Sequence, residues 1–152
     1  MNEKILVNKP WGSEYLIYEN NKVAVWMLNI NFNHSTSFHC HPNKKTGLIA
    51  LKGEASIELG FHETIRLSSP GKLMIRPGLF HSTKALSNGG IQLLELETPA
   101  DKKDLVRYSD GYGREGKPIE GNEAFVELKA DTIIFNEPEI GKQQHYEIGS
   151  SV

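Results

Sequence analysis

Short apolar or alternating runs of residues recur along this chain, separated by residues that favour tight turns. Seven such runs precede residue 100, at 14–18, 23–30, 47–51, 55–59, 64–67, 72–75 and 91–97. Turn-forming pairs such as Ser69-Pro70, Pro77-Gly78 and Asn88-Gly89 stand between them. Strands at intervals of about eight to twelve residues, bounded by Gly, Pro and Asn, are typical of an all-β sandwich or barrel. No run before residue 100 keeps a helical period over three turns, so we predict an all-β fold.

The pattern changes after residue 100. Residues 99–118 are polar and rich in Gly, and only 124–129 and 132–135 resemble further strands. A chain of 152 residues is the size of one domain. We therefore predict a barrel over residues 1–115 and a C-terminal extension over 116–152 that packs on the barrel or on a dimer partner. Because exposed sheet edges invite pairing, we expect a homodimer.

Composition argues against several classes of partner. The chain has 17 Lys and Arg against 19 Asp and Glu, a net charge of −2 without the basic footprint of a nucleic-acid-binding protein. No apolar run approaches the roughly 20 residues of a membrane span, and the first residues lack a signal-peptide pattern. Cys40 is the single cysteine, which fits a reducing compartment. We expect a cytoplasmic protein with a small-molecule partner, no nucleic acid and no membrane.

Two histidines lie at alternate positions of one segment. His39 and His41 have the same parity, so on a strand both rings point to one face, about 7 Å apart along the chain. An isolated pair of this kind can simply be exposed on a surface. A third histidine, His81, follows the Pro77-Gly78 turn by three residues. A barrel interior can bring side chains from separate strands to one point, so the three together are candidate ligands of a metal ion.

The segments around these histidines resemble the two sequence motifs of the cupin superfamily. SFHCHPNKKTGLIALKGEASI (37–57) is similar to the first motif and PGKLMIRPGLFH (70–81) to the second. The resemblance implies a cupin barrel, also called a double-stranded β-helix or jelly roll, with one divalent metal ion bound by His39, His41 and His81. The position of the family's glutamate ligand falls on Thr46, a poor ligand at neutral pH. Imidazole ligands suit Zn, Fe, Ni or Mn, and the residues do not choose among them.

The flanking segments give a narrower resemblance. KPWGSEYLIYENNKVAVWMLNI (9–30) and DLVRYSDGYGR (104–114) are similar to segments that bracket the cupin domain of type II mannose-6-phosphate isomerases. In that family a metal-binding Gln corresponds to His39. The resemblance implies a metal-dependent sugar or sugar-phosphate aldose–ketose isomerase, in carbohydrate or surface-polysaccharide metabolism. The change at Thr46 leaves room for a three-histidine site or for a carboxylate from residues 91–97.

Isomerisation of this kind moves a proton between adjacent carbons, so it needs a base near the carbons and an electrophile on the oxygens. Glu95 and Glu97 share one parity, and a carboxylate inside a barrel has a pKa raised toward the range of a useful base. Either is a candidate catalytic residue, and His34 is a weaker one. If Leu94 and Leu96 point inward instead, both glutamates lie on an outer polar face.

Basic residues near the histidines are candidates for binding an anionic substrate. Lys44, Lys45 and Arg107 could hold a phosphate, with Lys45 also a candidate catalytic residue and Thr46 a candidate substrate contact. The two lysines could equally form a solvated turn. Arg107 lies in 104–114, which we predict to be a loop near the barrel mouth; a structural pair with Asp104 or Asp110 is the alternative.

Two other classes of function stay open. One is a sugar-nucleotide epimerase that uses a histidine in a metal-free cupin barrel. The other is a non-catalytic cupin that binds a sugar and has lost turnover with the glutamate missing at Thr46. Stoichiometric bound metal would count against the first, and a sugar phosphate bound tightly but returned unchanged would support the second.

Overall fold

The computed structural model describes residues 6–113, 125–126 and 139–143, and within these residues it contains strands and no helix. The strands are β1 Leu6–Lys9, β2 Gly12–Glu19, β3 Ala24–Ile30, β4 Phe38–Cys40, β5 Lys45–Lys52, β6 Glu54–Leu59, β7 Glu63–Ser68, β8 Lys72–Ile75, β9 His81–Ala85, β10 Ile91–Thr98, β11 Val106–Ser109 and β12 Phe125–Val126. The prediction of an all-β fold is confirmed.

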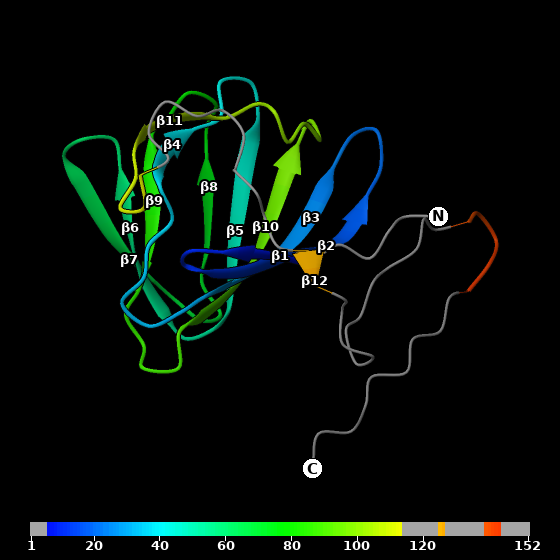
Figure 1. Ribbon diagram of the computed structural model, residues 1–152. Coiled ribbons are helices and arrows are strands. Elements are labelled where there is room, and N and C mark those ends of the chain that lie inside the picture. The colour runs from blue at the N-terminus through cyan, green and yellow to red at the C-terminus, as the bar shows by residue number, and fades with distance from the viewer. Residues whose placement is uncertain (1–5, 114–124, 127–138, 144–152) are drawn as a thin grey trace, which may run out of the picture.

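These strands form two antiparallel sheets that face each other (Figure 1). The larger has the order β12-β1-β2-β3-β10-β5-β8, and the smaller has the order β11-β4-β9-β6-β7. Among the described strands no hydrogen-bonded ladder joins the two sheets into a closed barrel. The fold is therefore a double-sheet sandwich, with the jelly-roll arrangement that the resemblance implied.

The seven runs found in the sequence all overlap strands. Strand β10, inside the larger sheet, pairs with β3 on one side and β5 on the other. Its residue Leu93 is fully buried, as are Ala50 of β5 and Ile57 of β6 in the facing sheet. These side chains form the core that holds the two sheets together.

Two glycines bring the turns at the apolar end of the sandwich into close contact. Gly53, between β5 and β6, has a φ of +84°, and a Cβ there would lie 2.5 Å from the carbonyl oxygen of Gly90. Gly90, just before β10, has a φ of +76°, and a Cβ would lie 2.4 Å from the carbonyl oxygen of Ile30. A side chain fits at neither position, so this end is closed by backbone packed on backbone.

The region after β10 differs in part from the prediction. Residues 104–114 were predicted to form a loop, but Val106–Ser109 form β11, which extends the smaller sheet by pairing with β4. The run is too short and too polar to show a strand period by itself. Phe125–Val126, within the strand predicted at 124–129, pair with β1. The predicted strand at 132–135 and most of the extension 116–152 lie outside the described residues.

The described part of the chain includes no helix of the length and apolarity needed to span a bilayer.

Candidate metal centre

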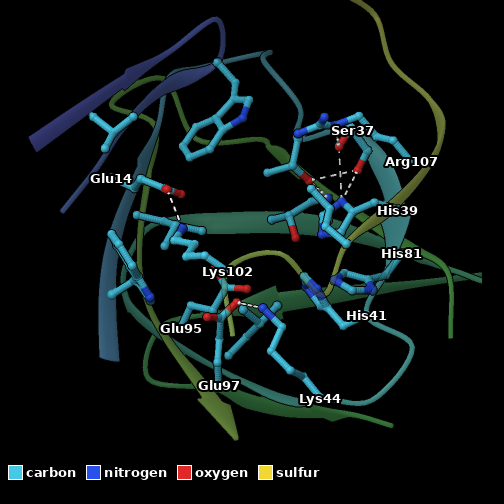
Figure 2. Close-up of a pocket in the computed structure, with 18 of the residues that line it drawn as sticks. Glu14, Ser37, His39, His41, Lys44, His81, Glu95, Glu97, Lys102 and Arg107 are labelled. Carbon is cyan, nitrogen blue, oxygen red and sulfur yellow. Dashed lines mark hydrogen bonds and ion pairs between the residues drawn. The ribbon is translucent and has the colours of Figure 1, made fainter. Parts of the chain in front are cut away.

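A cavity of about 340 Å³ lies between the sheets, at the end opposite the closed glycine turns. Figure 2 shows its polar side chains: three histidines along one wall, and two glutamates with two lysines along another. Apolar side chains, among them Trp11, Trp26 and Leu48, form the remaining surface. Polar groups converging in a largely apolar cavity are the usual form of a binding site for a small molecule.

The three histidines converge because β4 and β9 are neighbours in the smaller sheet. His39 on β4 stands directly opposite His81, the first residue of β9, and His41 follows β4 with the same parity as His39. The ring centroids are 4.5 to 5.5 Å apart. One nitrogen from each ring lies within 4.8 Å of the other two, a spacing at which one ion can be held.

Each ring has its Nδ1 atom fixed by a backbone carbonyl. Nδ1 of His39 lies 2.8 Å from the oxygen of Ser37, that of His41 2.8 Å from the oxygen of Asp104, and that of His81 3.0 Å from the oxygen of Leu79. A carbonyl oxygen only accepts, so each Nδ1 carries the proton and donates it. The lone pair is then on Nε2, which is the arrangement that metal-ligating histidines show.

The surroundings keep the three imidazoles neutral. Burial lowers the pKa of His39 well below its usual range, and the two neighbouring histidines lower it further. Burial and the Lys44 ammonium lower the pKa of His41 to about 3, and burial lowers the pKa of His81. Only a neutral imidazole can offer a lone pair to a cation, so at neutral pH all three are ready to bind one.

Strand β10 supplies two carboxylates to the facing wall. Glu95 and Glu97 have the parity of the buried core residue Leu93, so they point inward. Lys44, also inward, places its Nζ 2.7 Å from Oε1 of Glu97. Burial, with the neighbouring Glu97 charge, raises the pKa of Glu95 to about 8. The site thus combines nitrogen ligands on one sheet with an ion pair and a readily protonated carboxyl on the other.

Comparison with solved structures identifies the fold. The chain is similar to KdgF from a Halomonas species, with 16% identity over 61% of this chain and 84% of that one, and a TM-score of 0.57. It is similar to oxalate decarboxylase from Lactobacillus farciminis, with 14% identity over 70% of this chain and 34% of that one, and a TM-score of 0.61. It is also similar to the cupin domain of Cnp3 from Schizosaccharomyces pombe, with 12% identity over 57% and 65% of the two chains, and a TM-score of 0.52.

The chain has the cupin fold. Identities this low show a shared fold and leave activity open. No protein-family model matches the chain, and a search by sequence finds no curated protein that matches it. The cupin part of the sequence resemblance is thereby supported, and the narrower resemblance to type II mannose-6-phosphate isomerases stays an expectation.

The residues predicted from the sequence occupy different places in this fold. His39, His41 and His81 converge as predicted, and Glu95 and Glu97 line the cavity although Leu94 and Leu96 could have taken that face.

The two adjacent lysines point in different directions. Lys44 is inward and 1% exposed, whereas its neighbour Lys45, predicted to be catalytic, is exposed and is not part of the cavity wall. Thr46, predicted to contact substrate, is inward but covered, so it is buried without lining the cavity. Alternation along β5 causes both outcomes. His34, the weaker candidate base, is exposed.

Arg107 is buried and lines the cavity behind His39. Its Nε donates to Oγ of Ser37 at 3.1 Å, and that Oγ lies 3.2 Å from Nδ1 of His39. The guanidinium therefore contacts the residue that orients a histidine. Its position is set by β11, where Arg107 stands opposite His39 in the register.

Three charged residues of the cavity region were not anticipated. Nζ of Lys102 lies 2.7 Å from Oε1 of Glu14 and 3.6 Å from the centre of the Trp26 ring, while Nζ of Lys9 lies 3.2 Å from the same Glu14 oxygen. A register shift in β2 after Leu16 breaks the alternation that would have marked Glu14 as inward. Lys102 belongs to a segment without any period, so the sequence contains no signal for it.

Proposed function

We propose that this cupin is a metal-dependent isomerase of a sugar or sugar phosphate, with one divalent ion held by Nε2 of His39, His41 and His81. The observation that carries the proposal is that three neutral imidazoles and the Glu95 carboxyl face one cavity. Three uncharged ligands leave the ion its full charge of 2+ and leave positions open for substrate. A bound ion would polarise the carbonyl and hydroxyl oxygens on adjacent carbons of a sugar, which makes the hydrogen on the hydroxyl-bearing carbon easier to remove.

The protein's own residues support the proton transfer. Glu95 is half-buried, lines the cavity and lies on the sheet opposite the histidines. A substrate between the two walls would have its oxygens toward the imidazoles and its carbon toward Glu95. In its ionised form, the Glu95 carboxylate takes the proton from one carbon and returns it to the next, which a single base can do within one site.

The remaining walls suit a small polar molecule with an anionic group. Trp11, Trp26 and Leu48 exclude water from one side, and Lys102 and Lys103 line the cavity where it approaches the surface. Since Lys44 pairs with Glu97 and Lys102 pairs with Glu14, we propose that Lys103, which is exposed where it lines the cavity, attracts a phosphate. A homodimer, a cytoplasmic location and a role in carbohydrate or surface-polysaccharide metabolism remain predictions.

The test is proton exchange in D2O. Protein loaded with Zn, Fe, Ni or Mn is incubated with aldose and ketose phosphates of five and six carbons, and NMR records deuterium at C1 or C2. We expect exchange with at least one pair, and a loss of about 100-fold or more in Glu95→Gln with the metal retained. Exchange that is equally fast in Glu95→Gln, or absent from every pair, would contradict the proposal. Activity on a sugar nucleotide after chelation would favour the metal-free epimerase instead.

A further inference from the structure

We infer that Glu97 is a fourth protein ligand of the metal ion and that Lys44 is the residue that positions it. This inference rests on the proposed metal centre and goes beyond its three histidines. Glu97 lies on β10 in the sheet opposite His39 and His81, so the ion would be held between the two sheets and would not belong to one of them alone.

The first support is a group of buried polar atoms without partners. In the described part of the chain, Nε2 of His41 and Oε2 of Glu97 are both buried and make no hydrogen bond. His41 is 6% exposed and Glu97 is 4% exposed, so both side chains are deeply buried. An unsatisfied buried charge is costly. A cation between the two atoms would satisfy both.

The second support is their spacing. His41, Glu95 and Glu97 offer ligand atoms that all lie within 4.8 Å of one another, as do His39, His41 and His81. His41 belongs to both groups. Glu97 thus lies on the His41 side of the three-histidine set, and binding the same ion would bring its carboxylate closer to His39 and His81.

The third support is the way Lys44 holds the carboxylate. Its Nζ contacts Oε1 of Glu97 at 2.7 Å, which leaves Oε2 as the atom without a partner. A lysine that is 1% exposed is unusual unless it is paired, and this pairing fixes the Glu97 side chain in one orientation. Lys44 thus leaves Oε2 of Glu97 available to bind a cation.

One residue links this ion pair to the histidines. The Asp104 carboxylate accepts from the backbone N–H of Lys44 at 2.9 Å, and its backbone carbonyl accepts from Nδ1 of His41 at 2.8 Å. The same residue therefore orients His41 and anchors the chain at Lys44. His41 and Glu97 are prearranged through a single connected set of contacts, as ligands of a metal ion usually are.

Glu97 and Glu95 then have separate tasks. Glu97 is held by Lys44 and deeply buried, whereas Glu95 is half-buried and faces the part of the cavity where substrate would lie. Three imidazoles with one carboxylate are a nitrogen and oxygen ligand set, which suits Mn, Fe, Ni or Zn without a thiolate. The ligand set would carry one negative charge, and the bound ion would keep a net charge of about 1+.

The test uses Mn²⁺ affinity, measured by competition with a chelator, and the visible absorption spectrum of Co²⁺-loaded protein. In Glu97→Gln we expect Mn²⁺ to bind at least about tenfold more weakly and the Co²⁺ spectrum to change, because a ligand is lost. Lys44→Met should weaken binding by about tenfold through misplacement of Glu97. Lys45→Met, the exposed neighbour, is the matched control and should bind Mn²⁺ as the wild type does.

A second variant keeps the test valid if a single substitution unfolds the protein by leaving one buried charge unpaired. Lys44→Met combined with Glu97→Gln removes both charges, so this double variant should fold. It should still bind Mn²⁺ more weakly than the wild type and give a changed Co²⁺ spectrum. If this double variant binds Mn²⁺ as tightly as the wild type with the same Co²⁺ spectrum, the inference is wrong and the three-histidine centre stands. If the wild type itself binds no ion, the inference and the proposed metal centre fail together.

Discussion

The two ends of the interior differ in chemistry although the same strands build both. Along β10 the inward residues are Ile91 and Leu93 at one end and Glu95 and Glu97 at the other. At the first end the two sheets are in contact, and Leu93 and Ile57 are fully buried. At the second end the sheets enclose a cavity. The strand period is the same throughout, so only the choice of side chain separates the core from the site.

This contrast shows how one sheet can provide stability and binding. The apolar end needs no ligand, because each side chain there already has neighbours on both sheets. The polar end contains buried atoms that lack partners, Nε2 of His41 and Oε2 of Glu97 among them within the described residues. Substitutions at the first end should therefore change the stability of the protein, and those at the second should change what it binds.

The largest expected effect on stability comes from the apolar end. Leu93→Ala removes a fully buried side chain and leaves a cavity, so the free energy of unfolding should fall by about 2–5 kcal/mol. The folded variant should still bind one metal ion per chain. Urea denaturation followed by metal analysis measures both. Leu94→Ala, on the opposite face of β10 and half-buried, should cost about 1 kcal/mol. A loss of metal in folded Leu93→Ala would contradict the claim that the apolar end determines stability and the polar end determines binding.

The next largest expected effect is a loss of stability in acid, caused by protonation of His41 at the polar end of the metal-free protein. The pKa of His41 is about 3 in the folded chain and about 6.5 in the unfolded one, so the unfolded chain binds the extra proton between these values. Stability is complete above pH 6.5 and falls as the pH decreases toward 3. At pH 5 the loss from His41 alone should be about 2 kcal/mol.

Denaturation of chelator-treated protein at pH 7 and pH 5 measures this loss. His41→Ala should lose less stability between the two pH values than the wild type, whereas His62→Ala, at an exposed position, should lose as much as the wild type does. An identical loss in His41→Ala would show that other groups cause the acid sensitivity.

The smallest effect concerns Arg107, which contacts Ser37, whose Oγ in turn lies beside Nδ1 of His39. Arg107→Lys should weaken metal binding by less than about tenfold, because the histidine keeps its bond to the Ser37 carbonyl. The melting temperature of the metal-free variant should stay near that of the wild type. Isothermal titration with Mn²⁺ measures the change, and Arg66→Lys on β7 is the exposed control. A lower melting temperature with unchanged affinity would assign Arg107 to the packing of β11 on β4.

Much of the fold and the histidine cluster followed from the sequence because local periodicity determines both. The long alternating runs became strands, and the equal parity of His39 and His41 placed both rings on one face. β11 could not be predicted in this way, since Val106–Ser109 has only four residues and its apolar members, Val106 and Tyr108, are exposed while β11 pairs with β4. The buried member of this strand is Arg107.

The sequence alone could not decide whether the glutamates of β10 or its leucines point into the cavity. In β10 two leucines alternate with two glutamates, and apolar burial alone would favour Leu94 and Leu96 inward. The glutamates are inward because they share the parity of Ile91 and Leu93, which are buried in the core, and Lys44 then pairs with Glu97, 53 positions away in the chain. No local pattern distinguishes Lys44 from Lys45. Their different burial depends on the pairing of β5 with β8 and β10.

The central claim, that His39, His41 and His81 hold one divalent ion, is tested most directly by elemental analysis of protein purified without chelators. The wild type and His62→Ala should contain one transition-metal ion per chain, and His81→Ala should contain none. Because an ion that binds only the folded chain stabilises it, His81→Ala should also lose the increase in melting temperature that added metal gives the wild type. Full metal occupancy in His81→Ala would contradict the claim and would remove the electrophile from the proposed reaction.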